Sequence, residues 1–169
     1  ENQLCGRYGL DFCEVAPDLG EEGLPLRALG LAGAGFLRRE IESGAHAIIG
    51  LSHGRTLAAS VQQMPRIDAS QLRFVSLLGG LTRNYAANPH DVMHSIAEKT
   101  GGQAYLMPVP FFANSAEDRE VLLAQRGVRE VFEMSNRATL KVVGIGTLEA
   151  DAQLVTSGMM ELAELREIK

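Results

Sequence analysis

Short apolar runs alternate with stretches of helical periodicity along most of this chain. Four runs are rich in apolar residues and have the length of a strand: HAIIGLS (46–52), RFVSLL (73–78), QAYLMPVPFF (103–112) and TLKVVGIG (139–146). Apolar runs of this length predict buried β-strands. A further short strand is predicted over residues 11–16.

The stretches between these runs have the spacing of amphipathic helices. Apolar residues recur every three or four positions over 23–43, 56–63 and 128–134, and Ser115 followed by Asp118 predicts an N-cap for a helix over 116–125. The segment PHDVMHSIAEK predicts a helix that opens at Pro89 and stops at Gly101-Gly102. A last helix is expected in the tail.

Strands that alternate with helices of about ten residues predict βα units. The expected fold class is therefore α/β, with a mainly parallel sheet and helices on both faces. In such sheets, ligands bind outside the carboxyl ends of the strands. Three strands are predicted to end in glycine, which lets backbone N–H groups approach a ligand: Gly50 with Gly54, Gly79 with Gly80, and Gly144 with Gly146. The three loops are expected to form one pocket.

The segment GLSHGRT has two interpretations. As G-x-S-x-G it resembles the nucleophile elbow of a hydrolase with Ser52 as nucleophile, but the only acidic residue between His53 and His90 is Asp68, so a triad would have to form from the strand-helix units directly after the serine. As a phosphate loop it offers Ser52, Arg55 and Thr56 at the N-terminus of the helix that follows. We favour the phosphate interpretation, although a plain strand-to-helix turn has the same composition.

Other motifs carry weaker signals. The segment Gly144-Ile145-Gly146-Thr147 lacks the third glycine of a dinucleotide-binding loop, and GLAGAG (30–35) is expected to lie inside a helix that packs closely on the sheet. His90 and His94 share a helix face, but without a firm third ligand no metal site is predicted. Candidate groups for binding sugar hydroxyls are Asn88, His90 and Asp91, with Arg83 as a second cation near the pocket.

Composition narrows the class of partner. The chain has 169 residues, a net charge of −5 and 5% aromatic residues, so a nucleic-acid-binding face is not expected within it. The two cysteines are expected to be free thiols, and no apolar run approaches the roughly 20 residues of a membrane span. We therefore expect a cytoplasmic protein with no membrane partner. The chain lacks an initiator methionine, and we expect it to be part of a longer protein.

Four segments in order, GLSHGRTL, VSLLGGLTR, AYLMPVPFF and VVGIGTL, resemble the signature segments of the effector-binding domain of SorC-type bacterial transcriptional regulators. The resemblance covers about residues 1–160. It implies a Rossmann-like fold similar to sugar-phosphate isomerases and glucosamine-phosphate deaminases, used for sensing without turnover. It also implies a phosphorylated sugar as effector, no cofactor, a homodimer or homotetramer, and contact with DNA only through a separate helix-turn-helix domain.

The resemblance also assigns residues to loops. The family's phosphate loop corresponds to Ser52, His53, Gly54, Arg55 and Thr56. Its other pocket loops correspond to Gly79, Gly80 and Leu81, and to Gly144, Ile145, Gly146 and Thr147. Some relatives have a basic residue before the glycine pair, where this chain has Leu78, so Arg83 or Arg55 would have to supply that phosphate contact.

On this interpretation residues 1–169 are one effector-binding domain, from which the DNA-binding domain and a C-terminal portion of the family's pocket are absent. The alternative is a sugar-phosphate isomerase or lactonase-like enzyme on the same scaffold. Such an enzyme needs a general base, for which the candidates are His90, Asp91 and Glu149. None of them lies in a recognised catalytic motif.

Overall fold

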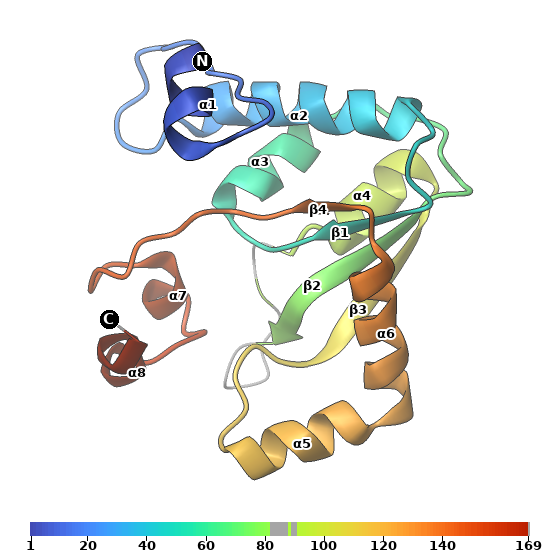
Figure 1. The fold of residues 1–169 in the computed structure, drawn as a ribbon, viewed down its shortest axis with the longest axis vertical. Coiled ribbons are helices and arrows are strands. Elements are labelled where there is room, and N and C mark those ends of the chain that lie inside the picture. Colours follow the sequence, from blue (N-terminus) through green and yellow to red (C-terminus); the bar gives the residue numbers. More distant parts are fainter. Residues whose placement is uncertain (82–87, 89–90, 169) are drawn as a thin grey trace.

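The predicted strands form a four-stranded sheet in the order β3-β2-β1-β4, and every pairing in it is parallel (Figure 1). The structure is a computed structural model that describes residues 1–81, 88 and 91–168. The strands are β1 (Ile48–Leu51), β2 (Arg73–Leu81), β3 (Gln103–Pro110) and β4 (Leu140–Val142). The predicted fold class, an α/β fold with a parallel sheet, is confirmed.

Helices cover both faces of this sheet, as predicted. On one face lie α3 (Arg55–Gln63) and α4 (Met93–Thr100), with α2 (Leu26–Glu42) packed on α3. On the other face α6 (Arg126–Arg137) crosses β1, β2 and β3 (Figure 1). The described chain also contains α1 (Asn2–Tyr8), α5 (Ala116–Ala124), α7 (Gln153–Thr156) and α8 (Leu162–Ile168).

The larger hydrophobic core lies between the sheet and the α2, α3 and α4 side. Phe74 of β2 and Ile49 of β1 are completely buried there, against Leu37 of α2 and Ile96 of α4. A smaller core under α6 contains Val75 of β2, Ile48 of β1 and Ala138, the residue that follows α6. Since burial of apolar area is the main driving force of folding, the α2–α3–α4 face supplies most of the stability.

The glycines of the GLAGAG segment let α2 approach another helix, not the sheet as expected from the sequence. A Cβ atom on Gly33 would lie 2.9 Å from Cβ of Ser60 in α3, and one on Gly30 would lie 3.1 Å from Cβ of Ala59. Glycine at these two positions therefore sets the close packing of α2 on α3.

His46 joins α2 to the residue before β4 at the amino edge of the sheet. Its Nε2 lies 3.0 Å from Oε2 of Glu40, and its Nδ1 lies 2.9 Å from Oγ1 of Thr139. A carboxylate only accepts hydrogen bonds, so Nε2 carries the proton in the neutral ring and Nδ1 accepts from the threonine hydroxyl. Both ring nitrogens are thus satisfied.

Several elements differ from the sequence prediction. Residues 11–16 form no strand, because an apolar run needs a neighbouring strand and Phe12 and Val15 lie exposed on an arm without one. The glycine pair lies inside β2, which continues to Leu81, and β4 ends at Val142, before its glycines. Helix α4 begins at Met93, four residues later than expected.

Strand β2 is irregular between two of its pairings with β3. Val75 pairs with Tyr105 and Gly79 with Met107, so three residues of β2 lie opposite one of β3. This bulge sits where β2 approaches the carboxyl edge. A second register shift follows between Gly79 and Leu81. The prolines of β3 cannot donate backbone hydrogen bonds, and they are tolerated because β3 is an edge strand.

Among the described residues, no helix combines the length and the apolar character that crossing a bilayer requires. Both cysteines, Cys5 and Cys13, are free, as the sequence predicts.

The contact between α2 and α3 yields a stability prediction. Gly33→Ala places a methyl group against the Ser60 side chain and should lower the free energy of unfolding by about 1–3 kcal/mol. In Gly35→Ala, the matched control on the same helix, the new Cβ lies 3.6 Å from the Arg39 guanidinium, an ordinary van der Waals distance, so this variant should be as stable as the wild type or slightly more stable.

Chemical denaturation of the full-length wild type and of each variant measures the difference in the free energy of unfolding. Equal stability of the two variants would show that α2 and α3 do not pack as closely as described.

Candidate functional site

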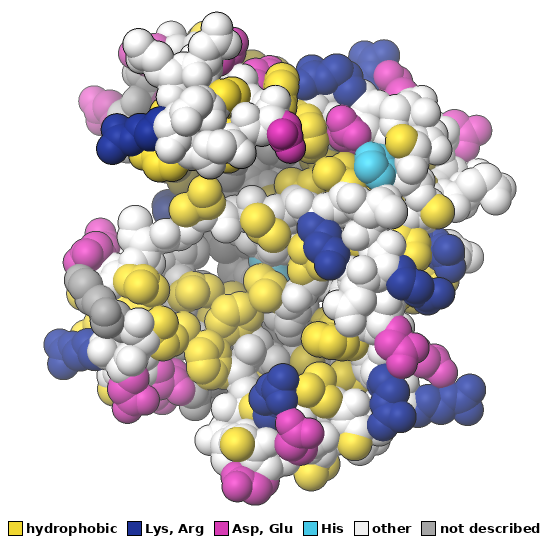
Figure 2. All heavy atoms as spheres, viewed as in Figure 1, with side chains coloured by type: hydrophobic (Ala, Val, Ile, Leu, Met, Phe, Trp, Pro, Cys, Tyr) yellow, Lys and Arg dark blue, Asp and Glu magenta, His cyan; other side chains and the backbone are white. Residues whose placement is uncertain are grey.

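The carboxyl ends of all strands lie at one edge of the sheet, on the side of α7 and α8 (Figure 1). At this edge β1 is joined to β4, because the backbone N–H of Ser52 donates to the carbonyl of Val142 at 3.0 Å. The surface on this side is hollowed and carries hydrophobic side chains (Figure 2). Val143 and Leu148, which follow β4, are among the exposed ones.

The N-terminus of α3 opens at this edge because α3 follows β1 after a turn of three residues. Its N-cap is Gly54, with φ 140° and ψ 161°, a conformation open only to glycine. No side chain caps this helix end, and nothing lies within 4 Å of the position of a Cβ atom on Gly54. Arg55, the first helical residue, is exposed, and Thr56 is half-buried. An anion in front of this turn would meet backbone N–H groups, the helix dipole and a guanidinium.

Ser52 is buried, with 5% exposure, and its hydroxyl is used within the protein. Its Oγ lies 3.4 Å from the carbonyl of His53, to which it donates, and accepts from the N–H of Gly144 at 3.3 Å. The serine thus links the end of β1 to the segment after β4. Neither contact is with a histidine ring or a carboxylate, so among the described residues the arrangement of a serine hydrolase is not formed.

His53 turns its ring toward β2. Its Nε2 lies 3.4 Å from Oγ of Ser76, while Nδ1 is enclosed and has no hydrogen-bond partner. Ser76 is completely buried and donates to the carbonyl of Leu78 at 2.6 Å, across the bulge of β2. Ser76 was not among the residues predicted from the sequence. The available signal was a hydroxyl in the middle of the apolar run RFVSLL.

The second loop comes together around Gly80. The N–H of Asn88 donates to the carbonyl of Gly80 at 3.2 Å, and the N–H of Asp91 donates to the carbonyl of Asn88 at 3.1 Å. The Asp91 carboxylate accepts from the N–H of Met93 at 2.7 Å, which fixes it at the start of α4. The other carboxylate oxygen of Asp91, Oδ2, would lie 3.5 Å from a Cβ atom on Gly80. Glycine there leaves room next to a carboxylate.

Gly79 is needed for the close approach of β2 to β3 more than for the conformation of the loop. A Cβ atom at this position would collide with the backbone carbonyl groups of Val109 and Pro110 in β3. Its small size is therefore required by the close approach of two strands.

The third loop is exposed throughout. Gly144 lies next to the backbone of His53, whereas Ile145, Gly146 and Thr147 extend into solvent, and Ile145 is fully exposed. Arg83 and His90 lie outside the described residues. Leu81 is placed only as the last residue of β2.

The structure therefore brings together three groups of the predicted residues at one edge. The turn 52–56, the group Gly80–Asn88–Asp91 and Gly144 all lie at the carboxyl ends of β1, β2 and β4, and His53 reaches from the first strand to the second. No group of three or more histidine, cysteine, aspartate or glutamate side chains within the described part of the chain is arranged to hold a metal ion.

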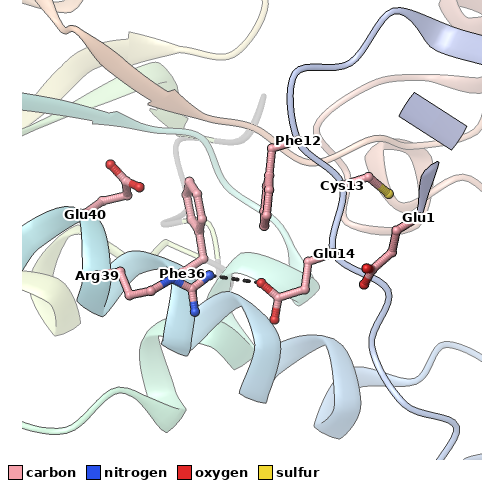
Figure 3. A pocket seen from close by; sticks show the side chains of 7 residues that line it. All are labelled: Glu1, Phe12, Cys13, Glu14, Phe36, Arg39 and Glu40. Carbon is pink, nitrogen blue, oxygen red and sulfur yellow. Dashed lines mark hydrogen bonds and ion pairs between the residues drawn. The ribbon is translucent and has the colours of Figure 1, made fainter. Parts of the chain in front are cut away.

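Two cavities in the described part of the chain lie elsewhere, and the first of them suits a phosphate poorly. One, of about 500 Å³, lies between the N-terminal arm and α2 and includes Phe12, Phe36 and the ion pair of Arg39 with Glu14 at 2.9 Å (Figure 3). Its lining contains three carboxylates and one guanidinium, which already has a partner. The other, of about 650 Å³, lies at the amino edge near His46 and Asp68. A dianion would be repelled from the first of these.

Comparison with known proteins agrees with the fold described above. The family model described as "Putative sugar-binding domain" matches residues 1–169. The erythritol catabolism regulatory protein EryD of Brucella abortus (strain 2308) is 74% identical over 168 residues, which is 99% of this chain and 53% of EryD. The chain spans about half the length of the curated relatives it matches.

Solved structures show the same fold. A DeoR family transcriptional regulator from Listeria monocytogenes superimposes with a TM-score of 0.85 at 20% identity, over 99% of this chain and 66% of that one. The full-length sorbitol operon regulator SorC from Klebsiella pneumoniae gives a TM-score of 0.78 at 25% identity, over 99% of this chain and 56% of that one. The chain belongs to the sugar-binding domain family of SorC-type transcriptional regulators.

Proposed function

We propose that this chain is the effector-sensing part of a bacterial transcriptional regulator and that its effector is a phosphorylated sugar or sugar alcohol. The observation that carries the proposal is the uncapped N-terminus of α3 at the carboxyl edge, with Gly54 at its N-cap and Arg55 as its first residue. The helix dipole contributes about 0.3–1 kcal/mol toward an anion. A charge-assisted hydrogen bond from Arg55 contributes about 1.5–3 kcal/mol more.

The carbon chain of the effector would lie along the carboxyl edge toward Gly80. There the Asp91 carboxylate offers acceptors for hydroxyl groups, and the hydrophobic side chains that follow β4 would shield the carbon skeleton. The 74% identity with an erythritol catabolism regulatory protein favours a four-carbon polyol, as erythritol or its phosphate. Arg83, Asn88 and His90, together with Gly144 to Thr147, remain proposed as further binding residues.

The whole protein would control transcription through a separate helix-turn-helix domain. With a net charge of −5, this chain itself has no reason to bind DNA. Effector binding would instead favour one arrangement of a homodimer or homotetramer, and so change the affinity of the distant DNA-binding domain. Such a protein acts in the cytoplasm and carries out no chemical reaction on its ligand.

Removal of the Arg55 guanidinium tests the phosphate position. In calorimetry on the full-length protein, Arg55→Ala should weaken D-erythritol 4-phosphate binding about ten- to one-hundred-fold, since one charge-assisted hydrogen bond is lost. Arg66→Ala, the control, removes an exposed arginine paired with Glu98 beyond the other end of α3 and should leave the affinity unchanged.

Unphosphorylated erythritol serves as a second probe, because its affinity should be the same in the wild type and Arg55→Ala. If Arg55→Ala binds the phosphate ester with unchanged affinity, the phosphate does not bind next to Arg55 and the proposed position is wrong.

The absence of catalysis is also testable. The full-length protein should not turn over ribose 5-phosphate or glucosamine 6-phosphate. It should also resist a fluorophosphonate probe, because Ser52 is only 5% exposed and its hydroxyl is engaged. A known serine hydrolase labelled in parallel is the control. Turnover of either sugar phosphate, or labelling that Ser52→Ala abolishes, would establish an enzyme.

A further inference from the structure

His53 holds an enclosed ring nitrogen that the fold leaves without a partner. Nδ1 of His53 is the buried side-chain atom in the described part of the chain that has no hydrogen bond. An unsatisfied buried acceptor is costly, and such groups are rare in folded proteins. His46, by contrast, has partners for both ring nitrogens. The missing partner of His53 therefore calls for an explanation.

The neighbours of His53 fix which nitrogen carries the proton. Ser76 has one hydroxyl proton, and its Oγ lies 2.6 Å from the carbonyl of Leu78, which can only accept. The serine proton is thus committed to Leu78, so its Oγ turns a lone pair toward Nε2 of His53 at 3.4 Å. In the neutral ring the proton is then on Nε2, and Nδ1 is a pure acceptor.

A phosphate dianion cannot supply the hydrogen-bond donor that Nδ1 of the neutral ring lacks. A phosphate monoester is mostly a dianion at pH 7 and offers only acceptor oxygens. A ligand hydroxyl, by contrast, donates one hydrogen bond. Although His53 lies in the turn that precedes α3, its chemistry therefore differs from that of Arg55. The two neighbouring groups are suited to different parts of one ligand.

The position of His53 suits a hydroxyl close to the phosphate end. It directly precedes Gly54, the N-cap of α3, and its ring reaches Ser76, which lies in the bulge of β2. A polyol phosphate with its phosphate at α3 and its chain directed toward Gly80 would pass this ring.

Contact with Nδ1 needs a small movement at the edge. The residue as a whole is partly exposed, although Nδ1 itself is enclosed. The segment after β4 lies beside it and is tied to Ser52 by one long hydrogen bond, 3.3 Å from the N–H of Gly144. Shifts of side chains and loops of this kind are common when a ligand binds.

We propose that His53 determines the specificity of the effector site, with its Nδ1 accepting a hydrogen bond from a ligand hydroxyl near the phosphate. This rests on the function proposed above. A site built to bond a hydroxyl rejects ligands that lack it, because the buried acceptor is then left unpaired.

Two substitutions separate the two ring nitrogens. In His53→Asn the side-chain Oδ1 takes the place of Nδ1 and keeps an acceptor there. In His53→Gln the terminal amide takes the place of Nε2 near Ser76, and the acceptor at the Nδ1 position is lost. We expect His53→Gln to bind D-erythritol 4-phosphate about ten- to one-hundred-fold more weakly than the wild type, and His53→Asn to bind it more tightly than His53→Gln.

The experiment is calorimetry on the full-length wild type and both variants, with D-erythritol 4-phosphate and its monodeoxy analogues as probes. One analogue should bind the wild type and His53→Gln equally, which identifies the contacted hydroxyl. Ring ¹⁵N chemical shifts should show a protonated Nε2 and an unprotonated Nδ1 in the free protein, with the Nδ1 resonance shifting on binding.

The outcomes separate the two proposals. If the wild type binds the phosphate ester and both variants bind it equally well, the hydroxyl contact is wrong and the proposed function stands. If the affinity of His53→Gln falls equally for every monodeoxy analogue, the contact is also wrong. If the wild type binds none of the phosphorylated probes, the proposed function fails and the contact with it.

Discussion

The parallel hydrogen bonding of β1 to β2 on one side and to β4 on the other is the constraint on which the site depends. All four residues of β1 are buried, so its backbone groups must be satisfied by these two neighbours. Parallel pairing on both sides then directs three strand ends to one edge, although those ends lie far apart in the sequence. The hydrogen bond from Ser52 to Val142 and the link from Gly144 to Ser52 extend this pairing one step beyond β1.

The same arrangement explains why the first loop contains chemically different groups. Gly54 ends the extended backbone and exposes the start of α3, where an anion is stabilised. His53 precedes Gly54 by one residue, and its ring lies next to Ser76 in the bulge of β2. Its Nε2 is therefore committed to the serine hydroxyl oxygen. The edge therefore combines a positive helix end, suited to a phosphate, with acceptors at His53 and Asp91 that are suited to hydroxyl groups.

Much of this fold can be predicted from the sequence because its signals are local. The apolar runs located β1, β2 and β3, and the spacing of Ser115 and Asp118 predicted an N-cap that the structure shows, with a 3.0 Å hydrogen bond. The run at 11–16 looked like a strand, but a strand depends on a partner that periodicity does not reveal. The continuation of β2 through its glycines depends likewise on the carbonyl groups of β3.

The candidate site was predictable as a set of loops and less so as a set of contacts. Residues 52–56 could be assigned to a turn before a helix, but the engagement of the Ser52 hydroxyl by Gly144 joins positions 92 residues apart. The pairing of His53 with Ser76 depends on a bulge that no local pattern indicates. Pattern and spacing identify the strands and their order along the chain, whereas the ends of β2 and β4 and the direction of each side chain are set by tertiary packing.

The most direct measurement is a crystal structure of the full-length protein with D-erythritol 4-phosphate bound. We predict phosphate density in front of α3, within hydrogen-bond distance of the backbone N–H groups that follow Gly54 and of the Arg55 guanidinium, with the carbon chain running toward Gly80. Phosphate density in the cavity at Arg39 or at the amino edge near His46 would contradict the proposed site.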